Sequence, residues 1–200
     1  NEQMKTLIQF DVLSSENSTE SIQADRSAGR IPASGSVNFF LKLFDVKTDQ
    51  TLPRDFTLVV SPISQSWEEG VGVDLDSLSD LTYDGTGSNW INASANTVWT
   101  NNSGKTLQGG SFLSSSTDGS PITEYDEFNY KQTFESGGEN LELDITGLIE
   151  QWILGTGGQS PSGKKGFNNY GVGLFLTASQ ASSSVRSYYT KRFSSRTSEY

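Results

Sequence analysis

The chain has 200 residues, a formal net charge of −10, no cysteine and no histidine. This length fits one ordinary domain, and the missing residue types exclude disulfides, thiolate metal sites, cysteine nucleophiles and Ser-His-Asp catalysis. Residues 1–180 carry 10 basic against 23 acidic side chains, a balance of −13, which disfavours a nucleic-acid partner because phosphates are repelled. No apolar run approaches the roughly 20 residues that span a bilayer, so no membrane partner is predicted.

The first half of the chain is predicted to contain three strands. Residues 4–12, 37–43 and 56–60 are apolar at alternating positions, which is the period of a strand with one buried face. Polar, proline- and glycine-containing segments separate them, and residues 21–30 show no clear periodicity. Because no amphipathic helix intervenes, these three strands predict an antiparallel sheet.

The middle of the chain is the least regular part. Residues 71–110 are rich in Asp, Ser, Asn and Gly and contain Trp90 and Trp99. A segment of this length without clear elements is usually a functional or partner-binding region in a compact domain, or else it contains elements that the pattern does not reveal. Weaker outer strands are predicted around residues 112–113 and 122–128.

The last third contains the most informative segment. Residues 141–145 alternate as a strand does, and residues 146–154 then place Leu148, Ile149, Trp152 and Ile153 at helical spacing. This pattern predicts a short helix with Asp144 or Thr146 as its cap, which ends at Gly155. Strands are also predicted over residues 172–176 and 185–193.

The segment LDITGLIEQWI, followed by glycines and NNYGVGLFL, resembles the closing half of a DNRLRE domain. That family is also described as a carbohydrate-binding-module-like jelly roll, and the similarity in order and spacing covers roughly residues 5–178. The resemblance implies an all-β, antiparallel jelly-roll β-sandwich of about eight strands. Because this scaffold serves many functions, it does not imply one activity.

A second resemblance concerns the segments IPASGSVNFFLKLFDV, TLPRDFTLVVSPISQSWEEG and SYYTKRFSSRTSEY. They are similar to structural proteins of tailed bacteriophages, particularly marine ones, that carry this jelly roll. The resemblance implies a virion component in the neck, tail or capsid region. In that group the last segment continues, so further residues are expected after Tyr200, and an upstream piece is expected before Asn1.

Aromatic side chains are the first candidates for ligand contact, because sugar faces stack on exposed indoles. Trp67 and Trp152 have apolar neighbours and are predicted to pack in the core. The candidates for contact with a glycan or a protein partner are Trp90, Trp99, Tyr83 and Tyr125. For the two tryptophans, packing under the long loops is the competing interpretation.

Acidic side chains suggest two further hypotheses. Asp74, Asp76 and Asp80 lie close together in the sequence, as a calcium site requires, although the spacing is not that of an EF-hand and an N-capped helical turn is the competing interpretation. Glycoside cleavage needs a pair of carboxylates across a groove, and the candidates for such a pair are Glu68, Glu69, Glu124, Asp126 and Glu127. Acidic residues on exposed strands are ordinary, so no catalytic residue is assigned.

The last 20 residues differ from the rest in charge. Residues 181–200 have a balance of +3 and are predicted to form a basic C-terminal extension to a sandwich of residues 1–180. Their cations are predicted to dock on an acidic neighbour: Arg186, Lys191, Arg192 and Arg196. We therefore predict a non-enzymatic virion protein that assembles with copies of itself and with other virion proteins. The alternative is a glycan-binding module that contacts host surface glycans.

Overall fold

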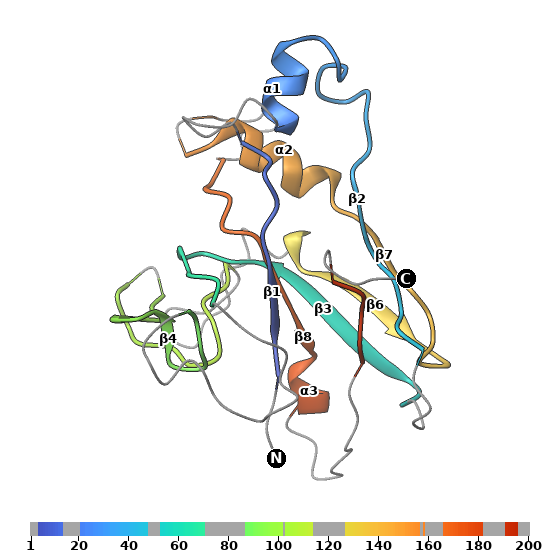
Figure 1. The fold of residues 1–200 in the computed structure, drawn as a ribbon, viewed down its shortest axis with the longest axis vertical. Coiled ribbons are helices and arrows are strands. Elements are labelled where there is room, and N and C mark those ends of the chain that lie inside the picture. Colours follow the sequence, from blue (N-terminus) through green and yellow to red (C-terminus); the bar gives the residue numbers. More distant parts are fainter. Residues whose placement is uncertain are drawn as a thin grey trace.

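The structure is a computed structural model that describes residues 4–13, 21–47, 53–70, 87–101, 103–113, 127–156, 158, 166–181 and 191–195. Within these residues the chain forms eight strands and three short helices (Figure 1). In chain order they are β1 (Thr6–Ile8), α1 (Ile22–Ser27), β2 (Phe40–Leu43), β3 (Phe56–Pro62), β4 (Asn92–Ser94), β5 (Thr97–Val98), β6 (Tyr130–Phe134), β7 (Leu141–Asp144), α2 (Thr146–Leu154), β8 (Val172–Leu176) and α3 (Ala178–Ala181).

The strands pair in a nested order. One sheet has the order β1-β8-β3-β6, β2 pairs with β7, and β4 pairs with β5. All of these pairs are antiparallel, which confirms the predicted class of antiparallel all-β protein. Strands β1, β2 and β3, however, do not pair with one another, so the sheet predicted from their order in the sequence is wrong. Each pairs instead with a strand from the second half of the chain.

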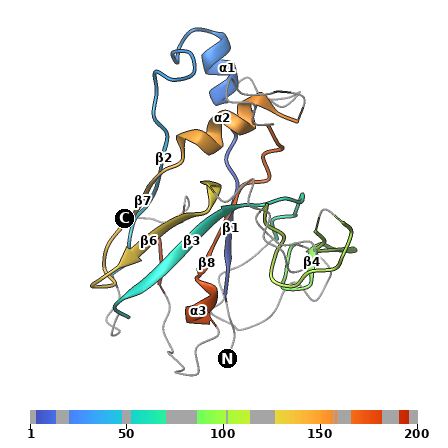
Figure 2. The ribbon, with the colours of Figure 1, turned by 180° about the vertical axis from the view of Figure 1, so that it is seen from behind.

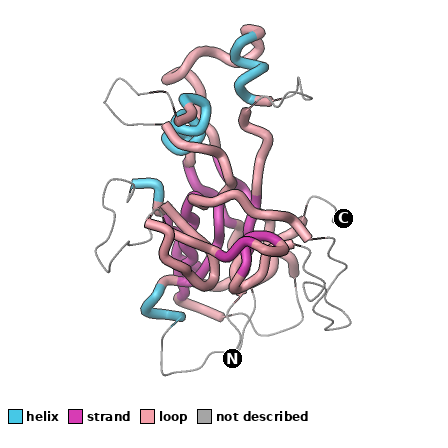
Figure 3. The backbone as a smooth tube through the Cα atoms, turned by 90° about the vertical axis from the view of Figure 1, so that its left-hand side faces the viewer, coloured by secondary structure: helices cyan, strands magenta, loops and turns pink. Residues whose placement is uncertain are grey.

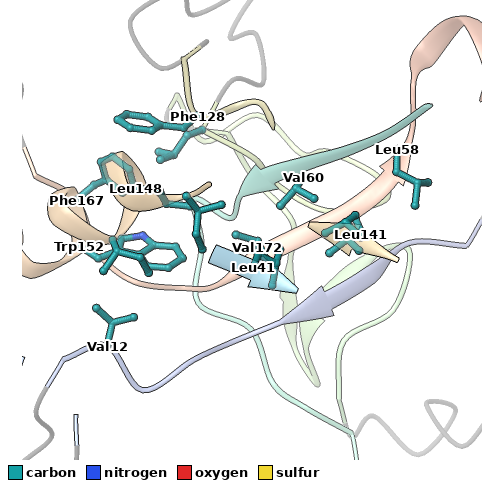
Figure 4. Close-up of a cluster of buried hydrophobic side chains, with 14 of the residues drawn as sticks. Val12, Leu41, Leu58, Val60, Phe128, Leu141, Leu148, Trp152, Phe167 and Val172 are labelled. Atoms are coloured by element: carbon teal, nitrogen blue, oxygen red, sulfur yellow. The ribbon is translucent and has the colours of Figure 1, made fainter. Parts of the chain in front are cut away.

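The main hydrophobic core lies between the four-stranded sheet, the β2–β7 pair and α2 (Figures 2 and 4). Leu41 and Leu141 enter it from β2 and β7, Val60 and Val172 from β3 and β8, and Trp152 from α2 (Figure 4). The rings of Phe56 and Phe134 stack with their centroids 4.9 Å apart. Seen from the side, most strands lie in the middle of the molecule (Figure 3). This arrangement of strands on both sides of one core is that of a β-sandwich.

Helix α2 lies where the sequence predicts it, and it ends where Gly155 takes φ 63°. Its start differs from the prediction. The capping position is Ile145, whose side chain makes no hydrogen bond, and Asp144 Oδ1 instead accepts from the backbone N–H of Thr146 in an Asx-type turn. The hydroxyl oxygen of Thr146 accepts from the N–H of Phe39, so this residue joins the helix to the segment before β2.

Several other predicted boundaries need correction. The strand predicted over residues 4–12 is confined to β1, and the one predicted over residues 37–43 begins at Phe40. Helix α1 falls in a segment for which no element is predicted, and the hydroxyl of Ser21 caps it by accepting from the N–H of Ala24. The predicted strands over 122–128 and 185–193 lie largely outside the described residues.

The edge of β7 that faces away from β2 is closed by a side chain. The amide of Gln132, on β6, donates to the carbonyl of Asn140 at 2.7 Å and accepts from the N–H of Glu142 at 2.8 Å. One side chain therefore occupies two backbone groups that a neighbouring strand would otherwise use. Such edge protection limits unwanted strand pairing.

Replacing Gln132 with alanine should expose this edge. The loss of two hydrogen bonds should lower the free energy of unfolding by about 1–2 kcal/mol. Urea denaturation measures this change, and Lys131→Ala, at an exposed position of the same strand, is the matched control. Equal unfolding midpoints for the two variants would show that the edge contact does not stabilise the fold.

Candidate functional site

Residues 87–101 and 103–113 form a small lobe beside the four-stranded sheet, and we call it the tryptophan lobe (Figure 2). It contains the β4–β5 pair, and its buried side chains form a second hydrophobic cluster together with Ile63 and with side chains of the main sheet. The side-chain oxygen of Asn89 accepts from the N–H groups of Ile91 and Asn92, which fixes the turn into β4. The sequence predicts an irregular contact region here, and the structure adds that this region packs on the main sheet through a shared hydrophobic cluster.

Trp99 belongs to this shared cluster. Its side chain is 1% exposed and packs with Ile63, Ala93 and Phe112. Its indole N–H donates to the carbonyl of Asn89 at 2.8 Å. Of the two interpretations of Trp99, packing under the long loops is the one that the structure supports, and the role in glycan or partner contact is wrong because its ring has no face open to a ligand.

Trp90 lies at the surface of the same lobe and is 40% exposed. Its six-membered ring lies against Gly109: a Cβ at that position would come within 2.8 Å of two ring carbons. Gly109 also has φ 75°, a conformation that favours glycine. Ile91 and Val98 of this lobe are also exposed, by 54% and 38%, so three apolar residues at or next to the β4–β5 pair reach the surface.

Lys5 connects the lobe to the start of β1. Its ammonium lies 5.1 Å from the ring centroids of Trp90, Phe112 and Phe175 and donates to the carbonyl of Gly109 at 2.6 Å. Burial among these rings lowers the pKa of Lys5 below its ordinary value of 10.5. Lys5 is not among the residues that the sequence predicts for a site. The rings and the carbonyl that surround its ammonium come from distant parts of the chain.

Replacing Lys5 with methionine should loosen the lobe while leaving the rest of the sandwich folded. Methionine keeps the apolar stem but removes the hydrogen bond and the cation–π contacts, which together should contribute about 1–2 kcal/mol. Hydrogen–deuterium exchange should become faster at the Gly109 N–H, which donates to the carbonyl of Trp90. Lys105→Met, at an exposed position of the same lobe, is the control. Unchanged exchange would contradict this role of Lys5.

The lowered pKa of Lys5 also gives this variant a pH signature. The unfolded chain holds the Lys5 proton more tightly than the folded chain, so this group makes stability rise with pH between its folded pKa and 10.5. In that range the difference in stability between wild type and Lys5→Met should therefore change in favour of the wild type as the pH rises. Urea midpoints measured at several alkaline pH values test the sign.

Trp67 joins the tryptophan lobe to the end of the main sheet. Its side chain is partly buried against the cluster around Trp99, and its indole N–H donates to the carbonyl of Tyr170 at 2.8 Å. Trp152 is completely buried in the main core. The packing roles predicted for these two tryptophans are confirmed.

The basic C-terminal extension is described only over residues 191–195. There Lys191 is 5% exposed, forms an ion pair with Asp45, and donates to the carbonyls of Gly137 and Glu139. Its predicted role in partner docking is wrong, because its donors are used inside the fold. Arg192 is exposed, as docking requires, while Arg186 and Arg196 lie outside the described residues.

Several candidate residues cannot be placed on this structure. The calcium candidates Asp74, Asp76 and Asp80 and the aromatic candidates Tyr83 and Tyr125 lie outside the described residues. Within the described ranges no cluster of three or more acidic side chains is arranged to hold a metal ion. The carboxylates Glu68, Glu69 and Glu127 are all exposed, and Glu124 and Asp126 are not described.

The comparisons with known proteins add no family. Neither the protein-family models, nor the curated proteins, nor the solved structures contain a significant match to this chain. In the part of the chain that the structure describes, no helix is long and apolar enough to cross a membrane. The tryptophan lobe combines exposed apolar side chains with one neighbouring cation, Lys5, which bonds to the backbone at Gly109.

Proposed function

We propose that this chain is a non-enzymatic assembly protein of a tailed-phage virion, built on a jelly roll. A jelly roll is a long antiparallel hairpin that is rolled up, so that its first strand pairs with its last and the inner strands pair in turn. The pairs β1–β8, β2–β7, β3–β6 and β4–β5 follow this nesting, and the further β3–β8 pair supports it. The virion setting is supported by the resemblance of residues 31–46 and 51–70 to phage structural proteins.

The observation that carries the assembly function is the apolar surface of the tryptophan lobe. Trp90, Ile91 and Val98 are each between 38% and 54% exposed. Exposed apolar groups that gather on one part of a folded surface mark contact with another macromolecule. Lys5 and Gly109 hold Trp90 in place, so little conformational freedom is lost when a partner binds.

Incorporation into particles tests this function. An aspartate at position 91 places a charge on the apolar surface without entering the core, so Ile91→Asp should reduce the amount of the chain in purified particles by about tenfold. Phe10→Asp, at a 38% exposed site on another part of the chain, is the control and should be incorporated normally. Equal incorporation of the two variants, or a chain that never enters particles, would contradict the proposal.

A glycan-binding module is the second candidate, and the exposed ring of Trp90 favours it. If this candidate is right, the purified chain should bind members of a glycan array, and Trp90→Ala should abolish the signal. The burial of Trp99 weighs against it, because a platform of two tryptophans cannot form.

A further inference from the structure

The outer face of the β2–β7 pair carries a second exposed surface, separate from the tryptophan lobe (Figure 1). Alternate side chains of β2 point to opposite faces of the pair. Leu41 and Leu43 point into the main core, whereas Phe40, Lys42 and Phe44 lie exposed on the outer face. Phe40, the first residue of β2, and Phe44, the residue after its end, are 49% and 52% exposed, which are unusual values for phenylalanine.

Charges of opposite sign lie on the two sides of these phenylalanines. On β7, Asp144 lies opposite Phe40 and Glu142 lies opposite Lys42, with the Lys42 ammonium 3.0 Å from the Glu142 carboxylate. On the other side of β2, the exposed Arg192 pairs through its carbonyl with the N–H of Val46. The face therefore places two phenylalanines and Lys42 beside the carboxylates of Glu142 and Asp144.

We infer that this outer face, formed by Phe40, Lys42, Phe44, Glu142 and Asp144, binds the same face of a second copy of the chain. A two-fold axis along the strands, between β2 and β7, would place β2 of each copy over β7 of the other. Lys42 of each copy then meets Glu142 of the other in addition to Glu142 of its own copy, while Phe40 and Phe44 of each copy leave water against the β7 side of the other copy. Charges that attract under this symmetry favour a second copy over an unrelated partner.

This inference deepens the proposed function by naming one partner, but it concerns a different surface from the tryptophan lobe. The two proposals can therefore fail separately. Self-association of the purified chain tests the present inference, and incorporation into particles tests the other.

Sedimentation velocity of the purified full chain over a range of concentrations measures the self-association. The wild type should form dimers, and the double variant Phe40→Ser with Phe44→Ser should associate at least about tenfold more weakly. Phe10→Ser is the apolar control. Because the replaced side chains point outward, each variant should keep its urea midpoint. A wild type that stays monomeric throughout, or a dimer unaffected by the double variant, would overturn the inference.

A charge exchange tests the geometry. Lys42→Glu alone and Glu142→Lys alone each place like charges against each other at both contacts, so each should weaken the dimer by about tenfold or more. An equimolar mixture of the two variants restores opposite charges at both contacts and should recover dimers. Lys131→Glu, on the outer side of the other sheet, should have no effect. Failure of the mixture to recover dimers would overturn the proposed pairing of β2 with β7.

Discussion

Replacing Trp152 with alanine should lower the free energy of unfolding by about 3–5 kcal/mol, the range for removing a large aromatic side chain from a packed core. Trp152 is completely buried on α2, and Val12, Leu148 and Phe167 belong to the same core cluster (Figure 4). Its indole N–H has no hydrogen-bond partner within the described structure. The expected loss therefore comes from packing alone.

Two companion variants make this prediction specific. Trp152→Phe keeps most of the ring and removes the unpaired N–H, so it should cost less, about 1–2 kcal/mol. Trp90→Ala makes the same chemical change at a 40% exposed site and should also cost about 1–2 kcal/mol. Urea denaturation measures all three. If Trp90→Ala destabilised the chain more than Trp152→Ala, the assignment of core and surface tryptophans would be wrong.

Replacing Lys191 with methionine should destabilise the chain by about 3 kcal/mol, because it breaks a buried ion pair and leaves one charge behind. The Lys191 ammonium bonds to Asp45 and to the carbonyls of Gly137 and Glu139, and it lies 5.1 Å from the ring centroids of Phe134 and Phe193. Methionine fills a similar volume but satisfies none of these oxygens. The C-terminal segment should then detach from β2.

Hydrogen exchange at the N–H groups of Val46 and Ser194 reports this detachment directly, since these groups bond residues 191–195 to the end of β2. Exchange at both should accelerate in Lys191→Met. Arg192→Met, at the exposed neighbouring position, should leave both rates and the urea midpoint nearly unchanged. Similar behaviour of the two variants would mean that Lys191 is not the anchor of this segment.

The parts of the fold that the sequence predicts correctly depend on local patterns. Helix α2 and its end at Gly155 follow from helical spacing and a glycine, and β3 follows from alternation. Helix α1 is not predicted, because none of its six residues is fully buried. Its sequence therefore does not repeat apolar residues at helical spacing. Its position depends on Arg26, which donates two hydrogen bonds to Glu150 of α2, 124 residues later.

The functional residues are harder to predict, because tertiary contacts decide them. Trp90 and Trp99 lie in the same polar stretch, yet one ring is exposed and the other is buried in the lobe. Lys191 looks like one of four basic residues in a tail until its acceptors, more than 50 residues away, are known. The sequence shows the sign of each charged side chain. It does not show whether that side chain lies in water or beside a carboxylate.

We propose that this chain works by holding the exposed apolar residues of the tryptophan lobe against another protein. A photo-reactive benzoylphenylalanine at position 91, activated in assembled particles, tests it most directly because the side chain at that position is 54% exposed at the edge of the tryptophan lobe. We expect a covalent adduct with a neighbouring protein chain, which mass spectrometry identifies. Recovery of the chain without any protein adduct, together with Trp90-dependent binding of the purified chain to glycans, would contradict it.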